Sequence, residues 1–489
     1  MQTGMRSYFF VSTFIIILLL SSCAKFIARQ IQQAENQADK VYPPVKTLYP
    51  ELKKSVDVKL ERYKSVQTRP HQRNDMAVAI AISGGGYRAA NLALGVLLGL
   101  EKIKSQGLKG NLLQEVDYFS TVSAGGLAVG FYLTKLHNYL QSKRNPPFSL
   151  QKAVNSMFWL EKEKANPLRA DLMDYLYTSN KQGLTIERIL NDTLLYTPEG
   201  GLAEKDIFIS QKSARAVQLP YWVTNSTIYQ NAAIFPFTPD VLATYRVRGF
   251  YHKQQDYIFR GSLTNPDYAF SMPVSVGLMA SMSVPFAVPS TTLISEACGK
   301  ECYLQLYDGG IADNLGVFTA LNLLSQDKAR IKLLMVIDSG KDLLQPFSQK
   351  REAPEGMSLV VRSATMTIDS TRKYLKSNLN LIAYRTLCMR DASHVVVIYF
   401  NLENYPRTQS ISSKLTMTLA EQKLLIEVGK ELVKKEKTLK QFLAELKKNE
   451  LMIGACQPIP EKNESPNKES LPLNKKLNEK IKKKGLKVV

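Results

Sequence analysis

The chain has 489 residues, which is enough for one large α/β domain with extensions or for two domains. The content of hydrophobic residues is 45% and that of charged residues is 22%. Both values are typical of a globular protein and exclude a chain of extreme composition. The formal net charge of +21 is unusual and favours a polyanionic neighbour, either nucleic acid or an anionic membrane surface. Composition alone does not choose between these two partners.

The N-terminus is organised as a secretory signal. Arg6 supplies a basic start, an apolar run covers residues 8–20, and small residues lead to Cys23. The run is shorter than the roughly 20 residues of a membrane-spanning helix. Leu20-Ser-Ser-Cys23 also resembles the lipobox of bacterial lipoproteins, which implies cleavage after residue 22 and lipidation of Cys23; a chance cysteine is the alternative. With Ala24 next, this resemblance predicts export and a lipid anchor in a bacterial membrane, with the outer membrane favoured, on its periplasmic or surface face.

Export also changes how the other cysteines are interpreted, because an oxidising compartment permits disulfides. Cys298 and Cys302 are close enough to bridge a short loop, which leaves Cys388 with Cys456. Buried free thiols are the alternative. No second close cysteine pair and no acidic or histidine cluster has ligand spacing, so neither a metal nor a cofactor is expected.

Residues 23–74 are polar and predict a tether with a helix near 52–63. The chain then changes character, because residues 76–82 form a continuous apolar run, which is typical of a strand buried on both faces. A glycine run and a helical pattern over 89–104 follow.

A second unit repeats this order. Residues 116–122 resemble a strand and lead into Ser123 and a helix that ends near residue 140, and a third apolar strand covers 332–337. Strands that alternate with helices predict an α/β fold with a central, mostly parallel sheet.

The C-terminal region continues this pattern more weakly. An apolar stripe from Leu425 to Leu446 predicts one amphipathic helix. Residues 457–489 are polar, interrupted by proline and rich in lysine, and they predict a disordered basic tail. This tail would contact an anionic lipid surface, although a merely soluble tail is the alternative.

Ser123 lies where a strand becomes a helix, between small residues. A nucleophile elbow needs this arrangement, because the sharp turn exposes the hydroxyl and the helix N-terminus points at the reacting oxygen. Thr121 replaces the first glycine of the usual G-x-S-x-G pattern. The alternative role for such a serine is a helix N-cap.

The run Gly84, Gly85, Gly86 also ends a strand and opens a helix. Consecutive glycines let backbone N–H groups converge on an anion, either a nucleotide phosphate or the oxyanion of acyl transfer. The dinucleotide fingerprint lacks its third glycine, and no Gly-Lys-Ser/Thr follows, so the P-loop is excluded. Arg88 lies in the first helical turn, where its charge could support the loop.

Asp308 ends an apolar strand and is followed by two glycines. An ordinary Asp-Gly turn is the alternative explanation. However, Gly84, Ser123 and Asp308 all fall at strand ends, where open parallel sheets form their sites. Asp308 can act as a base for Ser123, provided that an apolar pocket raises its proton affinity, and the glycine loop can stabilise the oxyanion.

Three motifs in this order, Ser-Gly-Gly-Gly-Tyr-Arg (83–88), Val-Ser-Ala-Gly (122–125) and Asp-Gly-Gly (308–310), resemble the patatin-like phospholipases. The segment 280–286 resembles that family's stretch ahead of the aspartate. The resemblance implies a three-layer fold and a Ser–Asp dyad of Ser123 and Asp308. It also implies an oxyanion site made by the glycine loop and Arg88. The implied substrate is a lipid or acyl ester at a phospholipid membrane surface, and no nucleic acid partner is expected.

Together, the residue patterns and this resemblance, which covers about residues 76–340, divide the chain into five parts. These are a signal peptide (1–22), a tether with a helical extension (23–74), a patatin-like catalytic domain (75–345), an α/β extension that packs on it (346–456) and the basic tail (457–489).

Three rival functions remain open at this point. One is an α/β-hydrolase with a Ser-Asp-His triad, for which His394 has the right order but precedes the strand at 395–400 and so falls at its amino end. Another is a non-catalytic, membrane-anchored binding lipoprotein, which the intact motif residues argue against. The third is a nucleic-acid binder, against which the export signal and the tail position of the lysines argue.

Overall fold

The computed structural model describes residues 73–142, 147–159, 219–252, 255–258, 272–285, 288–298, 301–341, 357–390 and 392–456, together with short stretches between 168 and 203. The expected signal peptide, Cys23, nearly all of the tether and the basic tail lie outside these residues.

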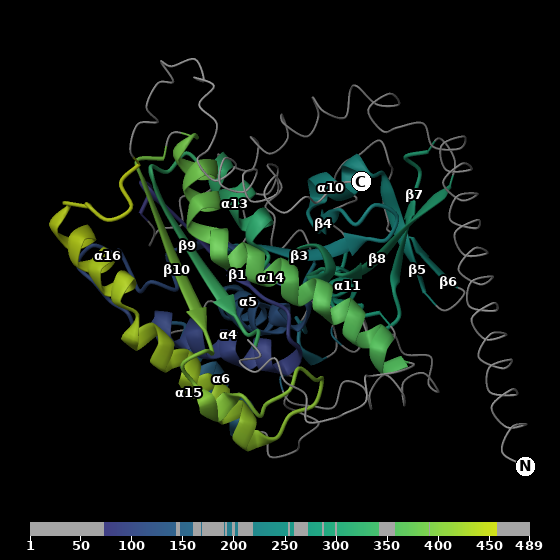
Figure 1. Cartoon of the computed structure of the whole chain (residues 1–489), viewed down its shortest axis with the longest axis horizontal. Helices are drawn as coiled ribbons and strands as arrows, with labels where there is room; N and C mark the ends of the chain where they lie inside the picture. Colours follow the sequence, from purple (N-terminus) through teal and green to yellow (C-terminus); the bar gives the residue numbers. More distant parts are fainter. Residues whose placement is uncertain are drawn as a thin grey trace, which may run out of the picture.

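The described strands form one sheet (Figure 1). Its strands are β1 (Met76–Ile82), β2 (Val116–Val122), β3 (Tyr221–Ile228), β4 (Ile234–Pro236), β5 (Val247–His252), β6 (Gln255–Ile258), β7 (Thr291–Ser295), β8 (Cys302–Asp308), β9 (Ile331–Asp338) and β10 (His394–Asn401). They are ordered β10-β9-β1-β2-β3-β8-β7-β5-β6, with β4 paired to β3. The five strands from β10 to β3 are mutually parallel, whereas those from β8 onward pair antiparallel.

Helices lie on both faces of this sheet and make it the middle of three layers (Figure 1). The described helices are α4 (Gly86–Glu101), α5 (Gly126–Gln141), α6 (Leu150–Trp159), α10 (Pro239–Thr244), α11 (Val274–Ser281), α12 (Gly310–Asp313), α13 (Val317–Gln326), α14 (Met357–Cys388), α15 (Leu419–Lys435) and α16 (Lys437–Lys448), with short 3₁₀ turns η1 (Ser123–Gly125) and η4 (Pro406–Thr408). None of these helices combines the length and the apolar character that crossing a bilayer requires. The predicted fold class is confirmed.

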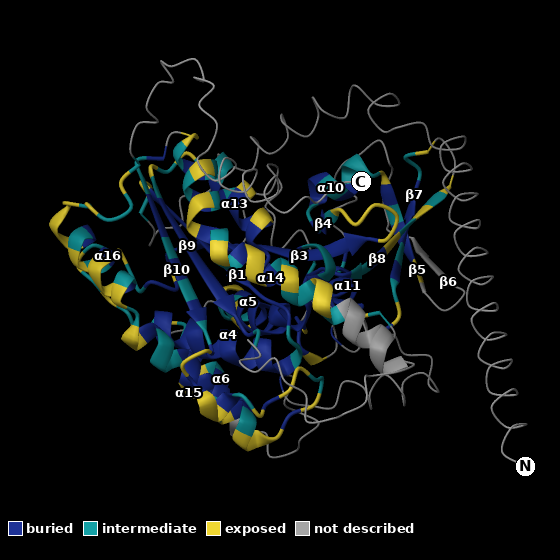
Figure 2. Cartoon of the chain, in the orientation of Figure 1, coloured by how far each residue is buried: buried dark blue, intermediate teal, exposed yellow. Residues whose placement is uncertain are grey.

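Strand β1 carries a continuous apolar sequence because both of its faces are covered. Every residue of β1 and β2 is buried, and Figure 2 shows the centre of the sheet as fully covered. Helix α4 is buried almost all round, because α15 packs on the side that faces away from the sheet. Its Gly95 permits this close crossing, since a Cβ there would lie 2.3 Å from the carbonyl oxygen of Ile426.

One expectation about the elements is wrong. The stripe from Leu425 to Leu446 belongs to two helices, because Glu436 is extended and its carboxylate caps α16 by accepting from the Thr438 amide. β8 is antiparallel to its neighbour β3 rather than part of the parallel set. Asp308 nevertheless reaches the edge where the parallel strands end, because β8 starts beyond that edge and pairs Asp308 with Ser226, close to the end of β3.

The segment 346–456 adds β10 to the same sheet, next to β9, and places α15 against α4. A disulfide joins Cys388, at the end of α14, to Cys456, and another joins Cys298 to Cys302. These are the two pairs that the cysteine spacing favours.

Candidate active site

Ser123 occupies a strained turn between β2 and α5. Its φ of 53° lies in the left-handed region, which non-glycine residues rarely adopt. The backbone N–H of Ser123 donates to Ser281 Oγ at 2.8 Å, and that hydroxyl donates to the carbonyl oxygen of Asn225 at 2.6 Å. The surrounding structure therefore holds the turn in a conformation that the residue would otherwise leave, as a nucleophile elbow requires.

Small residues after the turn let the neighbouring loop approach. A Cβ on Gly125 would lie 2.4 Å from the carbonyl oxygen of Ser83, and a Cβ on Gly126 would lie 2.7 Å from a methyl group of Leu278. Thr121 occupies the position of the first glycine in the usual pattern. The turn accommodates this side chain, whose hydroxyl accepts a hydrogen bond from the Trp222 indole at 2.9 Å.

Asp308 ends β8 and is buried, with 4% of its surface exposed. The backbone N–H of Asp308 donates to the Ser283 carbonyl and its own carbonyl accepts from the Thr227 hydroxyl, so the main chain is fixed on both sides. Its Oδ1 accepts from the Gly310 amide at 2.8 Å. Oδ2 completes no hydrogen bond of ordinary length and angle with any described residue.

The environment makes Asp308 a stronger base than a free carboxylate. Burial raises its pKa to about 6, while hydrogen bonding from the Ser123 hydroxyl and from the Gly310 amide acts in the opposite direction. The Ser123 hydroxyl is therefore close enough to the carboxylate to affect its pKa. Ser123 and Asp308 are brought together from strands β2 and β8, which are separated in the sheet by β3.

The glycine loop lies directly beside this pair. A Cβ on Gly84 would lie 3.1 Å from Ser123 Cβ and 2.7 Å from Asn314 Oδ1, so no larger residue fits without rearrangement. The Gly84 amide donates to the Asn314 carbonyl at 3.1 Å and is therefore already engaged. No acceptor is found for the Gly85 or Gly86 amide within the described part of the chain.

Arg88 lies on α4 and is buried. Its Nη1 donates to the Ile411 carbonyl at 3.1 Å. Burial lowers its pKa to about 10, while Asp338 acts in the opposite direction and Arg372 adds to the lowering. One of the charged groups that affect the pKa of Arg88 is thus Asp338, at the end of β9. The Arg88 charge would therefore act on the glycine loop from the β9 side.

The sequence patterns assign no role to several residues that shape this site. Ser281, Asn225 and Asn314 hold the elbow and the loop in place, and all three come from separate elements. Asn314 follows the aspartate motif closely, and that proximity is the signal that could have found it.

His394 begins β10 opposite Ile331, at the amino end of the parallel strands, so the structure does not bring it to Ser123. Within the described ranges, no group of three or more His, Cys, Asp or Glu side chains could hold a metal ion.

Residues 80–321 match the family model described as patatin-like phospholipase, a range that contains Gly84, Ser123 and Asp308. A search of curated proteins finds no significant match.

Among solved structures, human GIVD cytosolic phospholipase A2 is similar with 12% identity and a TM-score of 0.37, over 82% of this chain and 66% of that one. VipD from Legionella pneumophila is similar with 12% identity and a TM-score of 0.30, over 76% of this chain and 67% of that one.

Proposed function

The chain belongs to the patatin-like phospholipase family of lipid acyl hydrolases, and from this premise we propose that it cleaves fatty-acyl esters of membrane phospholipids or lysophospholipids with Ser123 as nucleophile and Asp308 as base. The observation that carries this proposal is the pairing of a serine in a left-handed turn with a buried carboxylate of raised pKa. Neither feature is needed to stabilise a fold, and both are used by acyl hydrolases.

The reaction follows from the positions of these two groups. Asp308 accepts the Ser123 proton as Ser123 Oγ attacks the ester carbonyl carbon, and the carbonyl oxygen becomes an oxyanion. Collapse of this intermediate breaks the ester bond, and the departing alkoxide takes the proton from Asp308. Water then attacks the acyl-enzyme with Asp308 as base, and the fatty acid leaves while Ser123 regains its proton.

The oxyanion needs donors that are already in place when charge develops. The amides of Gly85 and Gly86 suit this role, because the Gly84 amide is bonded to Asn314 and the other two have no acceptor among the described residues. A pKa of about 6 leaves Asp308 mostly ionised near neutral pH, while it remains more basic than a solvated carboxylate. This balance suits a dyad that has no histidine.

The membrane is the proposed location of this activity. The lipobox-like segment would anchor the chain through Cys23, and the basic tail would lie against anionic lipid. Labelling of cells with a radioactive fatty acid tests the anchor. Wild type should become labelled and Cys23→Ala should not, whereas equal labelling would contradict the assignment.

Fatty-acid release from phosphatidylglycerol vesicles and from p-nitrophenyl butyrate tests the reaction itself. The purified full chain should hydrolyse both substrates, and Ser123→Ala should reduce kcat on the order of 10⁴-fold or more. Ser275→Ala is a matched control, because Ser275 is also a buried serine and its hydroxyl has no hydrogen-bond partner in the described residues. Activity that survives in Ser123→Ala, or that is absent from wild type and both variants, would overturn the proposal.

A further inference from the structure

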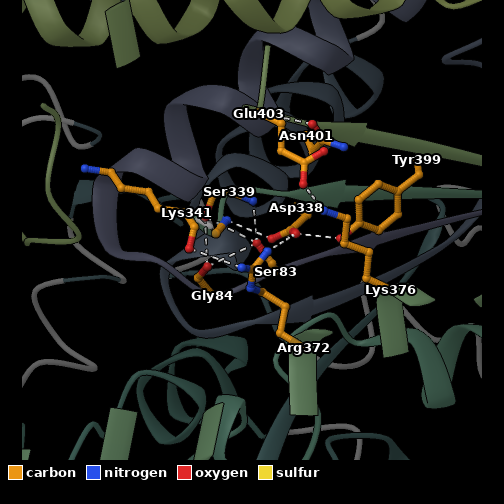
Figure 3. Close-up of polar contacts among 11 residues, drawn as sticks. Ser83, Gly84, Asp338, Ser339, Lys341, Arg372, Lys376, Tyr399, Asn401 and Glu403 are labelled. Atoms are coloured by element: carbon orange, nitrogen blue, oxygen red, sulfur yellow. Dashed lines mark hydrogen bonds and ion pairs between the residues drawn. The ribbon is translucent and has the colours of Figure 1, made fainter. Parts of the chain in front are cut away.

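The peptide that joins Gly84 to Gly85 is held from one side by two buried hydroxyl groups (Figure 3). Ser339 Oγ donates to the Gly84 carbonyl oxygen at 2.9 Å, and Ser83 Oγ lies 3.1 Å from the same oxygen. The Ser339 amide donates to Ser83 Oγ at 2.9 Å, which fixes the two hydroxyls relative to each other. Both serines are completely buried, so water cannot replace these bonds.

We call the hydroxyl groups of Ser83 and Ser339 the clamp. The clamp fixes the direction in which the Gly85 amide points. In a trans peptide the carbonyl and the following N–H point to opposite sides. Strand β1, which leads into Gly84, lies between β9 and β2. Ser339 follows β9 and Ser123 follows β2, so a Gly84 carbonyl turned toward Ser339 sends the Gly85 N–H toward the Ser123 side.

Contact distances show that the clamp is tight. A Cβ on Gly85 would lie 2.3 Å from Ser339 Oγ, so the hydroxyl lies directly against the Gly85 main chain. Gly85 has a φ of +142°, a value that glycine adopts readily and other residues do not. On the other side, the Gly84 amide donates to the Asn314 carbonyl. The loop is therefore held at both ends and cannot rotate this peptide freely.

A buried ion pair supports the turn that carries Ser339 (Figure 3). Asp338 Oδ1 accepts from the Gly340 amide at 2.7 Å, and Oδ2 accepts from Arg372 at 2.6 Å and from the Tyr399 hydroxyl at 2.5 Å. Arg372 comes from α14 and Tyr399 from β10. Three elements thus fix the turn on both sides of Ser339.

We propose that Ser339 is a positioning residue for the oxyanion site: its hydroxyl holds the Gly84 carbonyl so that the Gly85 amide faces the oxygen of the tetrahedral intermediate. This inference rests on the proposed function. Ser339 acts through Gly84 and does not itself touch the ester, so its removal should affect the rate of the chemical step more than substrate binding.

The test is steady-state kinetics of Ser339→Ala on p-nitrophenyl butyrate. Loss of a whole oxyanion donor lowers kcat by about 10²–10³-fold. Because Ser83 still contacts the Gly84 carbonyl, we expect a fall of about 10-fold in kcat for Ser339→Ala, with KM changed less than about twofold. The double variant Ser83→Ala/Ser339→Ala should lose about 10²-fold, and Ser339→Thr, which keeps a hydroxyl, should recover at least part of the loss.

A second readout separates positioning from general damage. Trifluoromethyl ketones form a tetrahedral adduct with a serine nucleophile and so require the oxyanion site. Inhibition by such a ketone should weaken by the same factor by which Ser339→Ala lowers kcat/KM. The control Ser275→Ala should change neither kinetic constant nor inhibition. If Ser339→Ala does not fold, Ser83→Ala removes the other hydroxyl of the clamp and gives the same comparison.

The outcomes distinguish the two proposals. If wild type is active and Ser123→Ala is not, while Ser339→Ala keeps its kcat or changes only KM, the positioning role is wrong and the proposed function stands. Equal losses in Ser339→Ala and Ser275→Ala would also overturn it. Activity that persists in Ser123→Ala removes the proposed function and with it the positioning role.

Discussion

Two aspartates lie at the same edge of the sheet and share a local design. Asp308 ends β8 and Asp338 ends β9, both are buried, and each accepts a hydrogen bond from the amide of the glycine two residues later. Their second carboxylate oxygens differ. That of Asp338 is bound by Arg372 and Tyr399, whereas that of Asp308 completes no hydrogen bond with the described residues.

We propose that this difference separates a structural carboxylate, Asp338, from a reactive one, Asp308. A buried carboxylate that is paired with a cation and hydrogen-bonded through both oxygens is held in place by its partners. A buried carboxylate without a cation retains proton affinity, and burial raises the pKa of Asp308 to about 6. On this proposal, two turns that share the same aspartate–glycine hydrogen bond carry different roles, and the neighbours of the second carboxylate oxygen decide which.

The largest expected effect is the loss of the base. Asp308→Asn should lower kcat by about 10³–10⁴-fold, because the amide cannot accept the Ser123 proton. The same variant should melt at the same temperature as wild type or higher at pH 8, because it removes an unpaired buried charge. Ester hydrolysis and thermal denaturation measure the two quantities. Near-normal activity would contradict the role of Asp308 as base.

The other aspartate should respond in stability. Asp338→Asn removes the carboxylate that pairs with the buried Arg372, so the free energy of unfolding should fall by about 3–5 kcal/mol. Urea denaturation measures this change. Glu403→Gln is the matched control, because Glu403 pairs with Lys376 of the same helix α14 but is more exposed; it should cost less than about 1 kcal/mol. Similar losses in both variants would show that Asp338 is not the structural carboxylate described here.

A third prediction concerns pH, and its sign follows from the raised pKa of Asp308. Catalysis needs the ionised carboxylate, so kcat/KM should rise with pH through about 6 and then level off. The free energy of unfolding should change in the opposite direction. Between about pH 4 and 6 the folded protein keeps a proton that the unfolded chain has lost, so stability falls as pH rises through this window.

Asp308→Asn removes this pH effect. As pH rises from about 4 to 6, the free energy of unfolding of the variant minus that of wild type should grow by roughly 2–3 kcal/mol. Above this window the difference should stay constant. Denaturation at pH 4 and pH 7.5 gives this difference, and a gap that shrinks with rising pH would contradict a raised pKa.

The smallest expected effect concerns the Tyr399 hydroxyl. Tyr399→Phe removes one hydrogen bond to Asp338 and leaves the Arg372 pair, so the loss should be about 1–2 kcal/mol. Its kcat should stay within about twofold of wild type, since Ser339 keeps its own bond to Gly84. A loss of stability as large as that of Asp338→Asn would mean that Arg372 alone does not secure the carboxylate.

Particular elements show what the sequence could and could not predict. Strands β1 and β2 were predicted at their observed bounds. For β1 the reason is that a short apolar run between turn residues has few alternatives to a buried strand. The helices α15 and α16 were predicted as one, because the apolar stripe keeps its phase while a single extended residue, Glu436, divides them. The antiparallel direction of β8 was also missed, since alternation of strands and helices does not show which way a strand runs.

The same division applies to the site. The sequence by itself determined the candidate nucleophile, base and glycine loop, because a tight strand end needs glycine or small neighbours and these leave a local pattern. Only the tertiary structure decided which aspartate is paired, which amide of the loop is engaged and which hydroxyl orients it. The partners of four residues lie far from them in the chain, namely those of Arg372, Tyr399, Asn314 and Ser339. The burial that raises the pKa of Asp308 exists only once the chain has folded.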